Sequence, residues 1–127
     1  MTAQLQKIRL ELARTKDAPD GDPHHGYELV APLDKDGHLD SRAWPSVSQL
    51  CTVRRFAPDE NEEHGLLIHS RGKQWAFSYE IGEEDDEPIY RLGEHRFAVG
   101  EYVSITEHDG ITRPFRVVSV APHRIGG

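Results

Sequence analysis

The sequence contains a single cysteine, Cys51, so no disulfide can form within the chain. It also lacks long apolar runs, and no stretch approaches the ~20 residues that a membrane-spanning helix needs. Residues 1–20 carry no apolar core of the kind that signal peptides have. These absences predict a cytoplasmic protein without a membrane partner.

The motifs of the common enzyme classes are missing as well. The sequence has no Gly-x-Ser-x-Gly, no glycine-rich loop that could cradle phosphate and no recognisable Cys-His pairing. Acyl transfer and nucleotide hydrolysis therefore have no support, and we predict neither a catalytic residue nor a cofactor. The formal net charge of −7 argues against nucleic acid as a partner, because phosphate contacts provide most non-specific affinity.

What the sequence does contain suits one small domain. It has 127 residues, of which 36% are hydrophobic and 29% are charged, and this predicts a small core with substantial loops rather than disorder. We expect a single domain over residues 1–127, with a loose tail at residues 123–127.

The clearest local signal is a hairpin within residues 95–121. Its segment Glu107-His108-Asp109-Gly110 predicts a type I turn followed by a left-handed glycine, which closes a three-residue loop with a bulge. This register pairs Val103 with Phe115. It also separates the side chains cleanly, because the apolar residues then share one face: Val103, Ile105, Ile111, Phe115 and Val117.

Alternating apolar and polar residues predict further strands. Residues 5–15 fit a helix or a strand, and we assign a strand because most of the chain downstream has period two. Other strands are expected at 27–33, 49–57, 66–69, 75–81 and 89–92. Pro32 should end its strand or place it on an edge. The connections are expected as loops at 16–26, 58–65 and 82–88, turns at 34–37 and 70–73, and one helical turn at 41–48 capped by Ser41.

The end of the last strand has apolar residues on both faces. Val118 and Val120 alternate with Val117, which predicts burial on both sides, as in a closed or nearly closed sheet. The fold prediction is therefore mainly β: a small antiparallel, partly open β-barrel or sandwich of about six to eight strands with at most one short helix.

Two sets of residues could hold a metal ion. In residues 34–40, three aspartates surround a tight turn, as carboxylates do in calcium sites, but the distal glutamate of a calcium loop is missing. Turn chemistry alone explains Asp and Gly there. The second set is the histidines, none with zinc-type spacing: His24, His25, His38, His64, His69, His95, His108 and His123. We predict no metal site, and His69 and His95, near strand ends, are the first to inspect.

Three charged or reactive features have ordinary explanations. The acidic run at 83–87 could attract a cation or a basic partner, but such blocks are usually solvated. Cys51 follows the pattern of a small buried hydrophobe, although Arg54 and Arg55 lie near enough in sequence to favour a thiolate. Seven arginines could line a surface on which Trp75, Phe77 and Tyr79 stack bases, but aromatics at period two usually form core. These arginines are Arg54, Arg55, Arg71, Arg91, Arg96, Arg113 and Arg116.

The segments GYELVAPLDKDGHLD, CTVRRF and FAVGEYVSITEHDG…FRVVSV resemble a set of small bacterial proteins of unknown function. The resemblance covers residues 8–121 and implies one cytoplasmic bacterial domain, with no activity, ligand or site residue. The functional hypothesis is a non-enzymatic binding or accessory module whose partner is another protein or a small ligand. The alternatives are a metal-binding protein or metal-dependent enzyme that uses clustered His and Asp residues, and a nucleic-acid-binding β-barrel.

Overall fold

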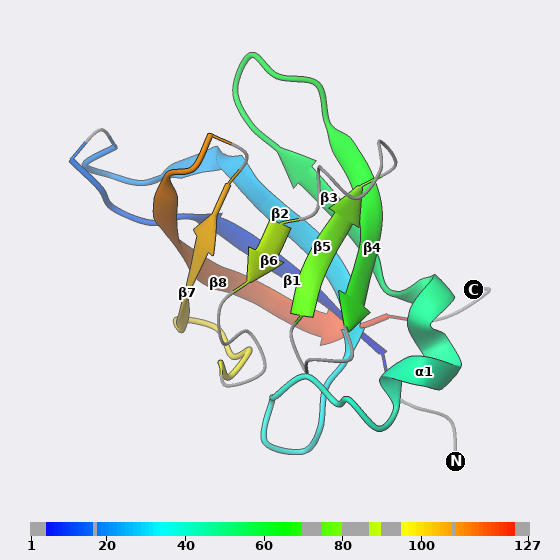
Figure 1. The fold of residues 1–127 in the computed structure, drawn as a ribbon. Coiled ribbons are helices and arrows are strands. Elements are labelled where there is room, and N and C mark those ends of the chain that lie inside the picture. The colour runs from blue at the N-terminus through cyan, green and yellow to red at the C-terminus, as the bar shows by residue number, and fades with distance from the viewer. Residues whose placement is uncertain are drawn as a thin grey trace.

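The computed structural model describes residues 5–16, 18–69, 75–79, 87–89, 95–107 and 109–123. Eight strands form one antiparallel sheet that curls into a half-barrel (Figure 1), which confirms the mainly β prediction. The strands are β1 (Leu5–Leu12), β2 (Asp22–Pro32), β3 (Thr52–Phe56), β4 (Glu63–His69), β5 (Trp75–Tyr79), β6 (Glu87–Ile89), β7 (Tyr102–Thr106) and β8 (Thr112–Pro122). Helix α1 (Trp44–Val47) continues into a 3-10 turn, η1 (Ser48–Leu50).

The order of strands across the sheet is β6-β5-β4-β3-β2-β1-β8-β7. The first strand, β1, therefore lies between β2 and the last strand, β8. The assignment of residues 5–15 to a strand is confirmed for Leu5–Leu12. Pro32 ends β2, as one of the two expected outcomes, and β2 itself is an interior strand of the sheet.

The core lies inside the curl. The ring of Tyr27 on β2 lies 5.2 Å from Phe77 on β5 and 5.2 Å from Phe115 on β8. These strands are not neighbours, so only curvature of the sheet can bring their inward side chains together. The predicted alternation of the aromatics on β5 is confirmed, since Trp75, Phe77 and Tyr79 are all buried.

The terminal hairpin has the predicted register. Val103 pairs with Phe115, Gly110 has a φ of +80°, and the Glu107 N–H donates to the Ile111 carbonyl at 3.1 Å. The predicted apolar face is correct for Val103, Ile105, Phe115 and Val117, all fully buried, but wrong for Ile111, which is 51% exposed. Ile111 lies beside the turn, beyond the paired residues of the two strands.

The prediction of two-sided burial at Val118 and Val120 is wrong, and a bulge explains the sequence pattern. Leu10 pairs with Val117 but Arg9 pairs with Ser119, so Val118 is an extra residue on β8. The extra residue shifts the alternation by one position. Val120 then lies opposite Ile8 and packs against the core.

The expected loop at 16–26 is wrong in its second half, because β2 begins at Asp22. Gly26 makes this possible: a Cβ at this position would overlap the carbonyl oxygen of Leu10. Glu11 on β1 pairs with Gly26, but the next residue, Leu12, pairs with Asp22. The residues between Asp22 and Gly26 therefore form a bulge in the pairing of the two strands. Proline and histidine are tolerated within such an irregular segment.

The helical turn is present, but its predicted cap is wrong. Ala43 precedes α1 and Ser41 makes no capping hydrogen bond to it. Instead, Asp40 Oδ1 accepts hydrogen bonds from the N–H groups of Arg42 at 3.0 Å and Ala43 at 3.1 Å. Pro45 stands in the first turn, where a missing N–H is tolerated.

Several remaining boundaries differ from prediction. β3 begins at Thr52, β4 begins at Glu63 within the expected loop at 58–65, and Glu87 and Pro88 belong to edge strand β6 rather than to a loop. The turn at 70–73, most of the acidic run at 83–87 and the strand expected beyond Ile89 lie outside the described residues. In the tail predicted to be loose, His123 is held, since its N–H donates to the Leu5 carbonyl at 2.8 Å. Residues 124–127 of that tail lie outside the described residues.

Candidate functional site

A buried carboxylate, Glu107, collects polar side chains from three other strands at one end of the half-barrel. Arg55 Nε and Nη2 lie 2.9 and 2.8 Å from its Oε2, and Arg113 Nη1 donates to Oε1 at 2.8 Å. Tyr27 donates its hydroxyl to Oε2 at 3.1 Å. His25 Nε2 lies 3.0 Å from both oxygens. The Glu107 side chain is 1% exposed, so protein donors replace its hydration.

The network keeps Glu107 ionised. Burial disfavours the charged form, but the hydrogen bond from His25 and the charge of Arg55 lower the pKa of Glu107 to about 2. Burial likewise opposes the charge of Arg55, and the attraction of Glu107 outweighs it and raises the pKa of Arg55. A general base needs a pKa near the working pH. Glu107 is therefore suited to joining strands rather than to proton transfer.

The outer rim of this network reaches solvent. Arg55 Nη1 lies 3.2 Å from Glu60 Oε1 and 3.4 Å from Glu63 Oε1. Arg113 also pairs with Asp109 at 2.8 Å, and this hydrogen bond lowers the pKa of Asp109 to about 2. The buried arginines are thus balanced by acids on both sides.

The signal for this network was in the sequence. Glu107 and Arg113 occupy positions on the same alternating face as Val103, Ile105 and Phe115, which makes them charged residues on an apolar face. Opposite charges at such positions indicate a buried ion pair. The partners from β2 and β3 could not be found this way, because their proximity depends on the curl.

The histidines do not gather. Within the described ranges no group of three or more His, Cys, Asp or Glu side chains could hold a metal ion. His25 belongs to the Glu107 network, His69 stacks on Trp75 with ring centroids 4.3 Å apart, and His95 is half-buried. His24 and His123 are exposed, His38 Nδ1 lies 3.9 Å from Asp34, and His64 Nε2 lies 3.6 Å from Glu62. His108 lies outside the described residues.

The aspartates at 34–40 hold backbone groups. Asp34 Oδ1 accepts hydrogen bonds from the N–H groups of Asp36 at 2.9 Å and His38 at 3.1 Å. The hydrogen bond from His38 is the main reason that the pKa of Asp34 is lowered. Gly37 has a φ of +87°. This part of the chain is therefore the predicted turn, and the carboxylates of Asp34 and Asp40 already accept hydrogen bonds from the backbone.

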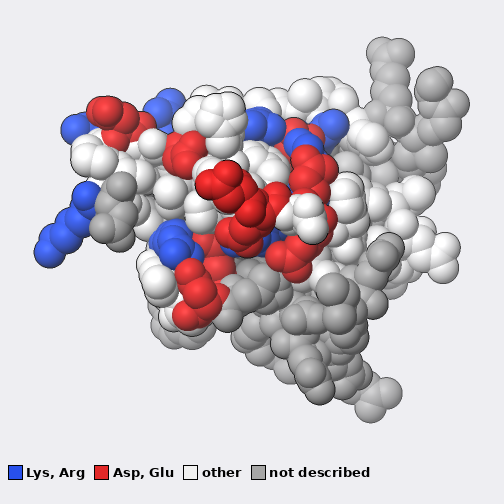
Figure 2. Space-filling model, turned by 90° about the horizontal axis from the view of Figure 1, so that it is seen from above, with Lys and Arg blue, Asp and Glu red and all other residues white. Residues whose placement is uncertain are grey.

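The aromatic stacking platforms considered for the arginine surface are contradicted by the structure. Trp75, Phe77 and Tyr79 face the core and are buried, so they cannot present their faces to bases. Arg54, Arg55 and Arg113 are paired with glutamates. Figure 2 shows Lys and Arg interspersed with Asp and Glu over the end of the molecule that it views, without a continuous positive area. Arg71 and Arg91 lie outside the described residues, and Arg96 and Arg116 are exposed.

Cys51 is a buried thiol. Its Sγ lies 3.3 Å from the Val47 carbonyl, to which it donates. Burial raises the pKa of Cys51 to about 11. A thiol in this state is a weak nucleophile at neutral pH, which confirms the interpretation as a small buried hydrophobe.

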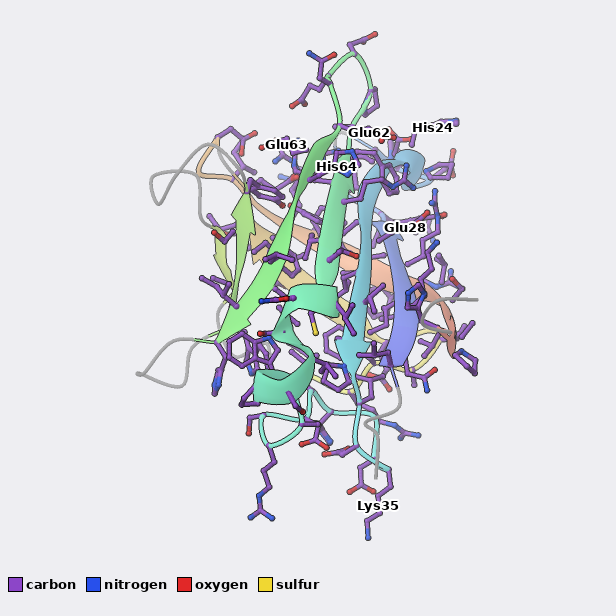
Figure 3. The ribbon with its side chains drawn as sticks, turned by 90° about the vertical axis from the view of Figure 1, so that its right-hand side faces the viewer. His24, Glu28, Lys35, Glu62, Glu63 and His64 are labelled. Carbon is purple, nitrogen blue, oxygen red and sulfur yellow. The ribbon has the colours of Figure 1, made fainter. Side chains whose placement is uncertain are left out.

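The outer face of the sheet carries a groove of about 720 Å³. It runs across the strands: Lys7 pairs with Val30, Thr52 with Leu66, and Leu66 with Ser78. The pairing of Leu29 with Val53 brings Val30 beside Thr52, so these residues form one row over five strands. Figure 3 views this side of the molecule, with α1 at one end of the strands and Glu28 and His64 toward the other.

The floor of the groove is apolar. It is lined by Val30, Leu66 and Ile68, and Leu66 is 38% exposed although it stands in the middle of a sheet. Because Leu66 lies in a concave and mostly apolar groove, this part of the sheet is a candidate binding surface. No sequence pattern predicted this row, because it depends on the register of four neighbouring strand pairs.

A row of ion pairs borders the groove on one side. Glu28 Oε1 accepts hydrogen bonds from Arg9 Nη1 and Arg54 Nη2, both at 2.6 Å, and Lys7 Nζ lies 3.4 Å from Glu28 Oε2. The guanidinium carbons of Arg9 and Arg54 stand 4.5 and 5.1 Å from the centre of the Phe56 ring. These stacked and paired cations form the border of the groove on this side.

Comparison with protein-family models, curated proteins and solved structures finds no match for the chain. The resemblance to small bacterial proteins therefore stays a prediction. Among the described residues, no helix has both the length and the apolar character needed to cross a membrane.

Proposed function

We propose that this protein is a non-enzymatic binding module that holds a small, largely apolar ligand in the groove across β1 to β5. The observation that carries the proposal is the exposed apolar floor around Leu66, set between polar borders. Small-molecule sites are typically concave, mostly apolar, and roughly 300–1,000 Å³ in volume. The groove, at about 720 Å³, lies in this range.

The chemistry elsewhere supports binding over catalysis. The most perturbed carboxylate, Glu107, is held ionised by its neighbours, and the thiol of Cys51 is held protonated by burial. Both states oppose the proton transfer or nucleophilic attack that these residue types perform in enzymes. The charged groups of the groove lie at its border, and the hydroxyls of Thr52 and Ser78 lie along the row of residues that crosses it. A few polar groups in a mostly apolar site are the usual means of orienting a small ligand.

The proposal can be tested with a neutral fluorescent probe, N-phenyl-1-naphthylamine, which brightens when it leaves water. We expect saturable binding to the wild-type protein. Leu66→Lys should weaken it at least about tenfold, because a charge replaces the centre of the floor and its burial is costly. Ile111→Lys is the matched control: Ile111 is 51% exposed and does not line the groove, so its replacement should leave binding unchanged.

Two results would contradict the proposal. The first is equal binding of the probe by wild type and Leu66→Lys. The second is a doubled mass in light scattering that Leu66→Lys returns to that of one chain, because the groove would then be covered by a second copy rather than by a small ligand. Circular dichroism of both variants shows whether the sheet is retained.

A further inference from the structure

We propose that the ligand of this groove is an amphipathic anion: an aliphatic chain that ends in a carboxylate, with the chain on Leu66 and the carboxylate at Lys7. This inference rests on the proposed function and adds the chemical class of the ligand. It follows from an asymmetry among the cations that border the groove, which are Lys7, Arg9 and Arg54.

The two arginines already donate short hydrogen bonds to acceptors within the protein. Arg54 donates to Glu28 at 2.6 Å and to Glu62 at 2.7 Å. Arg9 donates to Glu28 at 2.6 Å, to Glu11 at 2.7 Å and to the Pro23 carbonyl at 3.1 Å. Both also stack on Phe56. A ligand would have to break several short, charge-assisted hydrogen bonds to recruit either one.

Lys7 is held much more loosely. Its ammonium lies 3.4 Å from Glu28, beyond the usual length of a charge-assisted hydrogen bond, and its side chain is 55% exposed. Glu28 is at the same time satisfied by two guanidinium groups. The positive charge of Lys7 is therefore the one at the groove that can turn toward an incoming anion at little cost.

The position of Lys7 fits one end of an elongated ligand. Lys7 pairs with Val30 on the β1 side, and the floor continues from Val30 through Leu66 to Ser78 on β5. Five neighbouring strands span about 19 Å at about 4.8 Å per spacing. That distance accommodates an extended chain of about ten carbons with its head at Lys7. His123 lines the same end of the groove and adds a second nitrogen donor there.

The nearest negative charge does not oppose this arrangement strongly. Glu28 is 19% exposed, and although burial raises its pKa, the hydrogen bond and charge of Arg54 outweigh that effect and keep it ionised. Its charge is offset by Arg9 and Arg54 at 2.6 Å. Glu28 is thus the shared partner of three cations, and Lys7 is the most distant of them.

The experiment compares decanoate with decanol, which have the same chain length and differ in the head group. Each displaces N-phenyl-1-naphthylamine from the protein, at concentrations below micelle formation and at low salt. We expect wild type to bind decanoate about threefold to fivefold tighter than decanol, the size of one partly exposed ion pair. Lys7→Met should remove the preference, so that decanoate and decanol bind this variant with equal affinity.

Lys35→Met is the matched control, because Lys35 is an exposed lysine in a distant turn (Figure 3) and its removal changes the net charge equally. It should retain the preference for decanoate. If wild type binds decanol as tightly as decanoate, or if Lys7→Met keeps the preference, the proposal of an anionic head group is contradicted. The proposal that the groove binds an apolar ligand is unaffected by either result. If neither compound displaces the probe and Leu66→Lys still binds it, the groove itself is wrong.

Discussion

The Nε of Arg55 lies 2.9 Å from Oε2 of Glu107, although the two residues are 52 positions apart in the chain. This pair joins β3 to the terminal hairpin through the interior of the half-barrel rather than through the hydrogen bonds of the sheet. Both side chains are almost fully buried, at 5% and 1% exposure. The closure of this end of the fold therefore depends on a charged contact.

Glu107→Gln should lower the free energy of unfolding by about 3–5 kcal/mol, because it leaves the buried charge of Arg55 and the partly exposed charge of Arg113 without their shared carboxylate. Urea denaturation measures the change. The control is Asp109→Asn, which removes an acid that also pairs with Arg113 but is 48% exposed. That control should cost less than about 1 kcal/mol. A loss below 1 kcal/mol for Glu107→Gln would show that the network is dispensable.

Acid should destabilise the protein through the same residue. The pKa of Glu107 is about 2 in the folded protein and 4.5 ordinarily, so the folded state binds its proton more weakly than the unfolded chain. The stabilisation is complete above about pH 5 and is lost as pH falls toward 2. Urea midpoints at pH 7, 4 and 3 should fall less steeply for Glu107→Gln than for wild type. Parallel curves would contradict this assignment.

Cys51 should resist alkylation in the folded protein. With a pKa of about 11 and no exposed surface, its thiol should react with iodoacetamide at pH 8 roughly 100-fold more slowly than a free cysteine. In about 8 M urea, which unfolds the protein, the thiol should react at the rate of a free cysteine. Mass spectrometry follows the added group. Rapid labelling of the native protein would mean that Cys51 is accessible and its thiolate favoured.

Gly65→Ala should separate β4 from β5. A Cβ at Gly65 would overlap the Ser78 carbonyl, which cannot move without breaking the pairing of the two strands. We expect a loss of about 1–3 kcal/mol or more from this overpacking. Gly100→Ala is the control, since its Cβ meets nothing within 4 Å and pays only for a φ of +97°, about 1–2 kcal/mol. A melting temperature of Gly65→Ala equal to that of wild type would refute the steric argument.

Local features of the fold could be predicted from the sequence. The hairpin register followed from turn chemistry and alternation, and the strand with Trp75, Phe77 and Tyr79 followed from spacing alone. The strand predictions were wrong where a single residue shifted the alternation of side chains between the two faces of the sheet or allowed a strand to begin earlier. The bulge at Val118 imitates two-sided burial, and Gly26 lets β2 start within a segment that reads as a loop.

The candidate sites could not be predicted, because both depend on the order of the strands. His25, Arg55 and Glu107 come from segments far apart in sequence, and only the curl brings them together. The groove depends on the register between β1, β2, β3, β4 and β5, in which each pairing places one more residue in the row. Alternation shows which face a residue takes, but it does not show which residues become its lateral neighbours.

The position of β1 between β2 and β8 has a consequence for synthesis on the ribosome. On one side, Gln6 of β1 pairs with Ala31, which is made early. On the other side it pairs with Pro122, so this pairing cannot form until β8 has been synthesised. Until then β1 is an edge strand with unpaired backbone groups, next to apolar residues of the core. Strand β8 therefore covers the exposed edge of β1. Chains truncated before β8 should be prone to pair with one another through β1.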